Sequence, residues 1–320
     1  MSERRKFTSI DVSKNNNTTT IVLDSSVFST LDYKSACSEF EEICTEINQD
    51  DQTHVVVLII ENTNKSYSLK SINFDTLASI EEYRIASKID KIQCPIIVVM
   101  KGYIFDNLLE IALSGDIRVC TIDSVFGLKQ INNGFLPWDG ATQRLPRIIG
   151  KSKSVEMMLS GEVVTSEQAT NLGLVNYMVS QSEIEKYVAQ LVVKLESLAP
   201  IALRYVKEAV KEGLDMNLRQ GFLFESDLSI LLHRSIYNNS NYISYFVNFI
   251  LKLIKHNIRP IFIFDGKPPK EKNGVLELRK KNKEKSSKKA LSLLELKNKI
   301  NVIYKIVKSS DVLYQNNNND

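Results

Sequence analysis

The chain has 320 residues, of which 25% are charged and 43% are hydrophobic, as in an ordinary globular protein. No run of about 18 apolar residues occurs, so we expect no membrane span. No apolar stretch follows the basic start, so we also expect no secretory signal. The four cysteines lack the spacing of a metal site or a disulfide framework. We therefore expect an intracellular protein, in the cytoplasm or another reducing compartment.

The net charge of +3 conceals an acidic part and a basic part. Residues 233–320 carry 18 Lys and Arg against 7 Asp and Glu, whereas residues 1–232 carry 23 against 31. Such a division indicates two modules with different histories or partners. We expect a domain over 1–232, a basic segment over 233–308 and a polar, Asn-rich tail over 309–320.

Strand patterns alternate with helix patterns in the first half of the chain. Apolar runs predict strands and helical spacing predicts helices, giving strands at residues 18–23, 54–60, 96–100 and 117–122 and helices at 31–48 and 107–114. The run HVVVLII (54–60) is continuous, which is typical of a strand that is buried on both faces. The alternation predicts an α/β fold with crossover connections.

Helices are expected to dominate from residue 152 to 232. Thr165 and Gln168 have the spacing of a capping box, and Gly173 is placed to end the helix that they begin. Residues 183–199 and 200–212 are amphipathic. In the basic part we expect a helix at 242–255, a short strand at 259–264 and a long Lys-rich helix at 275–308.

Four consecutive blocks carry a resemblance to a known family. They are KGYIFDNLLEIALSGDIRV (101–119), FGLKQINNGFLPWDGATQRLPRIIGK (126–151), MMLSGEVVTSEQATNLGLVNYMV (157–179) and APIALRYVKEAV (199–210). In this order they resemble the enoyl-CoA hydratase/isomerase (crotonase) family, for about residues 7–232 and most clearly after residue 95. The resemblance implies a crotonase-like ββα spiral with C-terminal helices, a homo-oligomer (trimer or hexamer), and an acyl-CoA thioester substrate from fatty-acid metabolism. No further cofactor is implied, because the substrate itself carries CoA.

The family's chemistry needs two backbone N–H groups that point at the thioester oxygen as an enolate forms. The matching positions here are Leu69 and Asn107. Asp106, Asn107 and Leu108 stand where the family has a run of glycines. Glycine tolerates positive φ, and Asp and Asn tolerate it better than Leu does. A misaimed loop would impair catalysis, so a non-catalytic protein of the same fold is an alternative hypothesis.

One of the two carboxylates that hydratases use is matched by Glu110, while Gln130 stands at the other position. An amide can orient water but cannot exchange a proton at neutral pH. Asp139, nine residues later, is a candidate substitute. The alternatives are that Glu110 is an ordinary acid on a helix surface and that Asp139 serves only its local turn. With one matched carboxylate, double-bond isomerisation needs less machinery than water addition.

A second resemblance lies in the basic part. IRPIFIFDGKPPK (258–270) is similar to part of the N-terminal region of the flap-endonuclease/XPG family, within a stretch of about 233–300, which implies a partial α/β nuclease-like segment. Asp265 matches a Mg²⁺-binding aspartate, and Mg²⁺ would be needed only if this segment were functional. Two-metal nucleases need several clustered carboxylates, which this segment lacks, so we do not expect independent cleavage. The basic run RKKNKEKSSKK (279–289) fits phosphate contacts, and its alternative is a solvated helix face. Weak nucleic-acid binding by a fusion protein is therefore a third hypothesis.

Overall fold

The computed structural model describes residues 3–6, 10–24, 33–65 and 77–237. The chain divides into two units, residues 1–232 and 233–320, and the described elements belong to the first unit except for the end of the last helix. Leu69, Asp265 and the elements expected beyond residue 237 lie outside the described residues.

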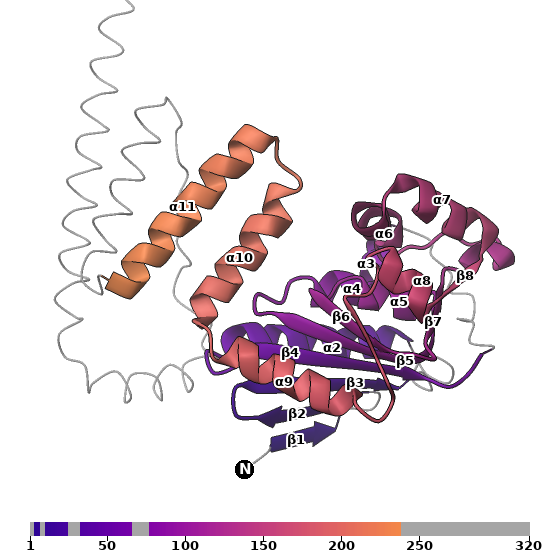
Figure 1. The fold of residues 1–320 in the computed structure, drawn as a ribbon, viewed down its shortest axis with the longest axis horizontal. Helices are drawn as coiled ribbons and strands as arrows, with labels where there is room; N and C mark the ends of the chain where they lie inside the picture. The colour runs from indigo at the N-terminus through magenta and orange to yellow at the C-terminus, as the bar shows by residue number, and fades with distance from the viewer. Residues whose placement is uncertain (1–2, 7–9, 25–32, 66–76, 238–320) are drawn as a thin grey trace, which may run out of the picture. The chain divides into compact units, whose positions relative to one another are not determined.

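A mixed sheet forms the centre of the described part (Figure 1). Its strands follow the order β1-β2-β3-β4-β5-β6-β9, and β7 joins β5 to β8. The bounds are β1 (Glu3–Lys6), β2 (Asp11–Asn15), β3 (Thr18–Asp24), β4 (Val55–Asn62), β5 (Ile96–Phe105), β6 (Ile117–Thr121), β7 (Val125–Gly127), β8 (Val163–Thr165) and β9 (Tyr177–Val179). The run from β3 to β9 is parallel, whereas β1 and β2 are antiparallel. The expected α/β fold with crossover connections is therefore confirmed.

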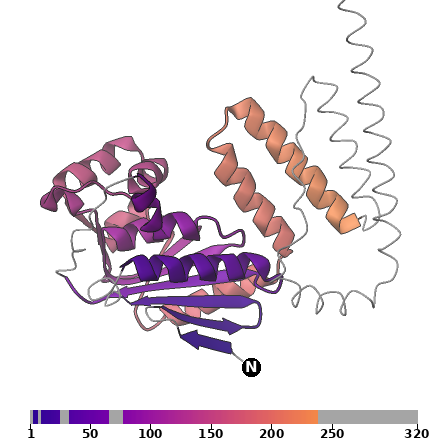
Figure 2. The same cartoon turned by 180° about the vertical axis from the view of Figure 1, so that it is seen from behind.

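Helices cover both faces of this sheet. They are α2 (Tyr33–Gln49), α3 (Leu77–Glu82), α4 (Ile85–Ile89), α5 (Asn107–Ala112), the 3₁₀ helix η1 (Gln130–Asn133), α6 (Ala141–Ile149), α7 (Lys151–Ser160), α8 (Ser166–Asn171), α9 (Ile184–Glu196), α10 (Pro200–Gly213) and α11 (Leu218–Tyr237). Helix α2 lies on one face and α9 on the other, as the two opposite views show (Figures 1 and 2). The expected capping box at Thr165 and Gln168 is present at the start of α8.

Strand β4 contributes side chains to two apolar cores because successive residues point to opposite faces. Val56, Leu58 and Ile60 belong to the larger core, which includes α2, α4 and α5. Val55 and Val57 belong to a smaller core under α9. The prediction that this strand is buried on both faces is confirmed. Neighbouring β5 carries the chain straight from this rigid centre into α5, the helix that holds Glu110.

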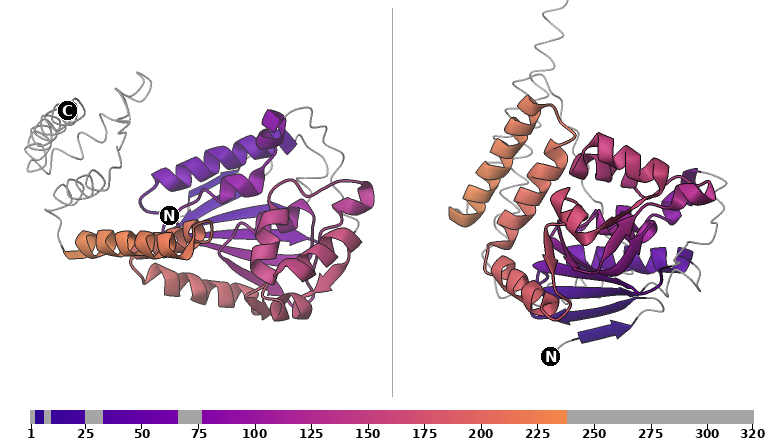
Figure 3. Two further views of the ribbon diagram at one scale, coloured as in Figure 1. Left: turned by 90° about the horizontal axis from the view of Figure 1, so that it is seen from above. Right: turned by 45° about the vertical axis from the view of Figure 1, so that its right-hand side comes forward.

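Helices α10 and α11 run side by side (Figure 3) and present apolar side chains to solvent. The exposed set includes Val206, Val210, Leu214, Leu218, Phe222 and Leu223. Two lysines of α10 bind residues that lie between the helices and strands around the sheet. Lys207 donates to Asp116 at 2.8 Å and Lys211 to the main chain of Asp90 at 2.6 Å. No helix among the described residues combines the length and the apolar character that crossing a membrane requires.

Candidate active site

Glu110 lies on α5, the short helix that begins two residues after β5 ends. Its N–H donates to the main-chain oxygen of Asp106 at 3.0 Å. Leu108, Leu109 and Ile111 on the same helix are buried in the larger core. These buried neighbours fix the position of α5. The Glu110 side chain is itself fully buried, so it has little conformational freedom. The alternative that Glu110 is a surface acid is wrong.

Gln130 and backbone N–H groups of the turn over residues 138–141 hold the Glu110 carboxylate. The side-chain amide of Gln130 donates to Oε1 at 3.1 Å. The backbone N–H groups of Asp139 and Ala141 donate to Oε2 at 2.7 and 3.1 Å. The motif containing Gln130 and Asp139 therefore folds over the α5 carboxylate.

Gly140 makes this convergence of two N–H groups feasible. It lies between Asp139 and Ala141 and has φ +101°, a conformation that glycine adopts without steric penalty. A Cβ at this position would lie 2.2 Å from Nη1 of Arg144, whose guanidinium donates to the main-chain oxygen of Asp139 at 2.8 Å. The turn thus needs glycine for its conformation, and a side chain here would displace the Arg144 guanidinium.

Burial raises the pKa of Glu110 to about 8. The N–H of Ala141 acts in the opposite direction, while the negative charge of Asp139 adds to the rise in pKa. A carboxyl removed from water favours its neutral form unless donors compensate for the lost hydration. Glu110 therefore titrates in the range where a group can both take up and release a proton at neutral pH.

This raised pKa predicts a pH-dependent stability. The folded chain keeps a proton on Glu110 up to about pH 8, whereas an unfolded glutamate releases it near pH ~4.3. The free energy of unfolding of the wild type should therefore fall, relative to Glu110→Gln, as pH rises through this window. We expect a change on the order of a few kcal/mol, measured by chemical denaturation at a series of pH values.

The matched control is Glu162→Gln, which removes an exposed carboxylate. Its stability should follow that of the wild type at every pH. A Glu110→Gln difference that does not change with pH would contradict the raised pKa.

Gln130 begins η1 and is 4% exposed. Its Nε2 faces Glu110, and its Oε1 is buried without a hydrogen-bond partner among the described residues. If the amide turns over, Oε1 faces the carboxyl and accepts from it once Glu110 is protonated. Gln130 can thus stabilise both protonation states of Glu110 without transferring a proton itself.

The Asp139 carboxylate points away from Glu110 and toward the start of α4. Oδ2 accepts from the N–H of Ala86 at 2.6 Å, and Oδ1 accepts from the N–H and hydroxyl of Ser87 at 3.0 and 2.9 Å. Burial raises the pKa of Asp139, while these donors oppose the rise. The side chain therefore caps the N-terminus of α4. The prediction that Asp139 acts as an acid or base is not tested by this geometry. Both carboxylate oxygens accept hydrogen bonds from α4.

Asp139→Asn separates the two roles. An amide offers one oxygen, so at least one buried N–H of α4 would lose its acceptor, at a cost of about 1–3 kcal/mol. We expect lower thermal stability with turnover within about tenfold of the wild type, since an acid/base role would cost about 10²–10⁴. Asp123→Asn, on an exposed turn, is the control. A rate loss of the larger size at unchanged stability would restore Asp139 as a proton carrier.

Asn107 is the first residue of α5 and is buried. The first N–H groups of a helix have no acceptor within it, which suits an oxyanion donor. Leu69, the expected partner, lies outside the described residues, so the convergence of the two amides remains a prediction. Among the described non-glycine residues, Asn16 and Asp106 have positive φ. Leu108 does not, so a leucine is tolerated at its position.

The sequence pattern of the enoyl-CoA hydratase/isomerase family matches residues 34–238. The chain belongs to this family. The 2,3-dehydroadipyl-CoA hydratase of Escherichia coli is 33% identical over 160 residues, which are 49% of this chain and 63% of that protein. The chain spans about half the length of two further curated relatives, 55% of a Bacillus subtilis protein and 46% of a mitochondrial protein of Arabidopsis thaliana.

Solved structures confirm the crotonase fold of this enoyl-CoA hydratase/isomerase family member. A Geobacillus kaustophilus enoyl-CoA hydratase structure has a TM-score of 0.67 at 23% identity, covering 81% of this chain and 99% of that chain. A Thermobifida fusca structure in complex with CoA has a TM-score of 0.63 at 18% identity, covering 71% and 94%. The sequence pattern of the XPG N-terminal domain matches residues 227–287. Both resemblances seen in the sequence are therefore confirmed.

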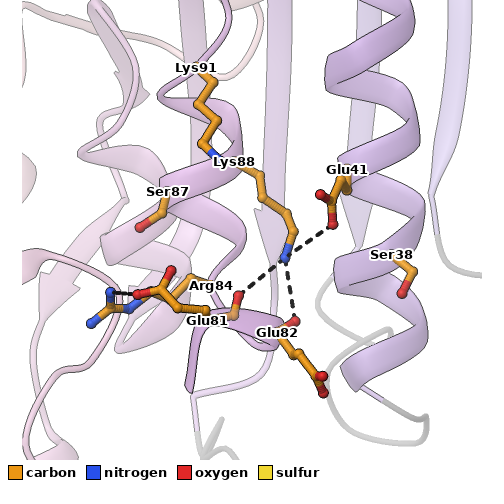
Figure 4. Close-up of a pocket in the computed structure, with 8 residues that line it drawn as sticks. All are labelled: Ser38, Glu41, Glu81, Glu82, Arg84, Ser87, Lys88 and Lys91. Atoms are coloured by element: carbon orange, nitrogen blue, oxygen red, sulfur yellow. Dashed lines mark hydrogen bonds and ion pairs between the residues drawn. The ribbon is translucent and has the colours of Figure 1, made fainter. Parts of the chain in front are cut away.

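A polar cavity of about 380 Å³ lies between α2 and the α3–α4 segment of this family member (Figure 4). It is lined by Ser38, Glu41, Glu81, Glu82, Arg84, Ser87, Lys88 and Lys91. Lys88 reaches across it to the carbonyls of Glu81 and Glu82 at 3.5 and 3.4 Å, at the end of α3. Ser87 connects its wall to Asp139, and Arg84 donates to the main-chain oxygen of Trp138 at 2.9 Å. The cavity wall thus supports the turn that covers Glu110.

Asp265, the expected metal ligand, lies outside the described residues. Within the described part of the chain, no group of three or more His, Cys, Asp or Glu side chains is arranged to hold a metal ion. The expectation of a Mg²⁺ site in the basic segment therefore stays a prediction.

Sequence reasoning missed the donors that complete the site. The N–H groups of Ala86, Ser87 and Ala141 have no side-chain signal, because every residue except proline carries an N–H. In the sequence Asp106 is visible only as a replaced glycine, and nothing in the pattern predicts its contacts. Its carboxylate accepts from the N–H of Lys129 at 2.5 Å, and the direction of that side chain depends on a backbone conformation that the sequence does not display.

Proposed function

We propose that this chain catalyses double-bond isomerisation in acyl-CoA thioesters, with Glu110 carrying the transferred proton. The observation that supports this most is the fully buried Glu110 carboxyl, with its pKa raised to about 8 and Gln130 as its side-chain partner. Gln130 cannot exchange a proton at neutral pH, and the Asp139 carboxylate faces Ala86 and Ser87 of α4 rather than Glu110. One carboxylate is therefore left for proton transfer, which suits isomerisation better than water addition.

The reaction moves one proton and one double bond. Ionised Glu110 removes a proton from C2 of a 3-enoyl-CoA, and the electron pair forms an enolate on the thioester. The same carboxyl then returns the proton to C4 as the double bond forms between C2 and C3. Glu110 ends ionised, as it began, and no other reactant is consumed. A carboxyl with a pKa near the working pH is suited to both halves of this cycle.

The developing enolate needs donors that are already in place. We propose the main-chain N–H groups of Leu69 and Asn107 for this role, following their positions in the family pattern. Loss of one such donor costs about 10²–10³ in rate. The N-terminal position of Asn107 on α5 supports its half of the pair.

The test presents the full-length protein with 3-enoyl-CoA and 2-enoyl-CoA thioesters of several chain lengths and identifies products by NMR. We expect isomerisation to be faster than hydration and to accelerate from about pH 6 to about pH 8, as Glu110 ionises. Faster hydration of 2-enoyl-CoA would instead show a hydratase. Thermal stabilisation by CoA thioesters without any turnover would show a non-catalytic acyl-CoA-binding protein.

A second candidate function, nucleic-acid binding, is favoured by the XPG N-terminal match over residues 227–287 and by the basic charge of 233–320. Lysines that contact phosphates make affinity fall steeply with salt. Replacing Lys285, Lys288 and Lys289 by Gln in the full-length chain should weaken DNA binding at low salt and reduce its salt dependence. Binding that these changes leave unaltered would exclude this segment as the contact.

We also propose self-association through α10 and α11. These helices expose several large apolar side chains to water, and a second copy of the chain would cover them. Sedimentation of the full-length chain should give a trimer or hexamer, and Phe222→Glu should dissociate it. A monomeric wild type would contradict the proposal.

A further inference from the structure

Asp106 occupies a backbone conformation that glycine favours. It lies between β5 and α5 with φ +51° and ψ −120°, a combination that costs other residues about 1–3 kcal/mol. Asn16 is the other described non-glycine residue with positive φ, and it lies in an exposed turn. Asp106 is 3% exposed, so its conformation is imposed within the core and must be offset there.

The offsetting contacts reach both halves of the site. The Asp106 N–H donates to the oxygen of Gly127 at 3.0 Å, and its own oxygen accepts from the N–H of Glu110 at 3.0 Å. Its carboxylate accepts from the N–H of Lys129 at 2.5 Å. Burial raises the pKa of this carboxyl to about 6, and the N–H groups of Lys129 and Gln130 oppose the rise. One residue is thus bonded to Glu110 on α5 and to the segment that begins η1.

The direction of the Gln130 side chain depends on the main chain where η1 begins. The pairing of β5 with β7 ends at Phe105 and Gly127, so it does not reach Gln130. Beyond it, the carboxylate of Asp106 fixes the main chain at Lys129 and Gln130. From there the Gln130 amide reaches Glu110 at 3.1 Å. Removing the carboxylate would take away its bonds to the main chain at Lys129 and Gln130, while Leu128 and α5 stayed in the core.

We propose that Asp106 is a positioning residue that holds Gln130 against Glu110. The aspartate that replaces a glycine at this position then holds the site together instead of impairing it. This inference rests on the proposed function, because the geometry it sets is that of the proton-carrying pair.

The experiment compares Asp106→Gly, Asp106→Asn and Asn16→Gly in the full-length protein. Glycine relieves the backbone strain and removes the carboxylate, whereas Asn keeps an oxygen for the N–H of Lys129. We expect Asp106→Gly to lower kcat for isomerisation about tenfold or more, with KM changed less than twofold. Asp106→Asn should retain most of the activity. Asn16→Gly relieves strain elsewhere and should leave kcat unchanged.

A double-mutant cycle with Gln130→Ala tests whether Asp106 acts through Gln130. Once the amide is gone, Asp106→Gly should lower kcat no further, whereas independent roles would give additive losses. Additive losses, or an Asp106→Gly variant as active as the wild type, would overturn the proposal.

A readout without turnover separates this inference from the proposed function. The carboxyl ¹³C signal of Glu110, identified by its absence in Glu110→Gln, reports its titration directly. Asp106→Gly should raise the midpoint, because the ionised carboxylate loses a donor, while Asp106→Asn should not. A wild type without turnover refutes isomerisation, and this titration then still decides the role of Asp106. An unchanged midpoint in Asp106→Gly refutes the positioning role.

Discussion

Glu110→Gln should lower the rate of double-bond isomerisation by about 10²–10⁴, the range that a positioned acid or base contributes. The physical reason is that an amide cannot take a proton from C2 or return it to C4 at neutral pH. Binding of CoA thioesters should change little, since the carboxyl acts on the reacting carbons. Steady-state kinetics and thermal-shift titration with a CoA thioester measure the two effects separately.

The variant should fold, because the neighbours of Glu110 can satisfy the amide that replaces its carboxylate. The amide oxygen can accept from the N–H groups of Asp139 and Ala141. The amide nitrogen can donate to the Oε1 of Gln130, which has no partner among the described residues of the wild type. Glu162→Gln is the control for removing one negative charge. Glu110→Gln with wild-type turnover would remove Glu110 from the chemistry.

Gln130→Glu should give the chain a hydratase activity that it otherwise lacks or shows weakly. A second carboxylate would stand where Nε2 now lies 3.1 Å from Glu110, and the pair would share one proton, because like charges at this distance disfavour double ionisation. One member can then activate water while the other supplies a proton. We expect hydration of 2-enoyl-CoA to rise roughly tenfold or more, measured by formation of the 3-hydroxyacyl product.

The control is Gln190→Glu, which places the same change on the exposed side of α9. It should leave both reactions unaltered. If Gln130→Glu folds and still does not hydrate, then the carboxylate count does not explain the choice of reaction in this chain.

The members of the site could be predicted from the sequence, but their roles could not. The alignment with the family's blocks identified Glu110, Gln130 and Asp139 as candidate site residues. The structure places the three in one buried cluster. The direction of the Asp139 carboxylate depends on Ala86 and Ser87, more than fifty residues earlier. Every residue except proline has a backbone N–H, so the sequence could not show which N–H groups donate to Glu110 and Asp139.

Long elements were predicted well because their patterns extend over several periods. The run at 54–60 gave β4, and helical spacing at 31–48 gave α2 within a few residues. Strands β7 and β8 have three residues each, too few for an alternation to stand out. They matter nonetheless, since β7 leads the chain toward Gln130.

The lost glycines had the least predictable consequence. Three replacements suggested general distortion of the loop, but among them the structure confines the positive φ to Asp106. Leu108 lies within α5 and packs in the larger core, where a leucine is favourable. A single tethered residue therefore absorbs the strain that glycine avoids in the family pattern.

A label that is followed through the reaction shows whether Glu110 carries the proton. A 3-enoyl-CoA deuterated at C2 is converted by the wild type, and the deuterium at C4 of the product is measured by NMR. Transfer by one buried carboxyl predicts that part of the label reappears at C4 and that Glu110→Gln forms product about 10²–10⁴ times more slowly. Product formed by Glu110→Gln at the wild-type rate would show that Glu110 does not carry the proton.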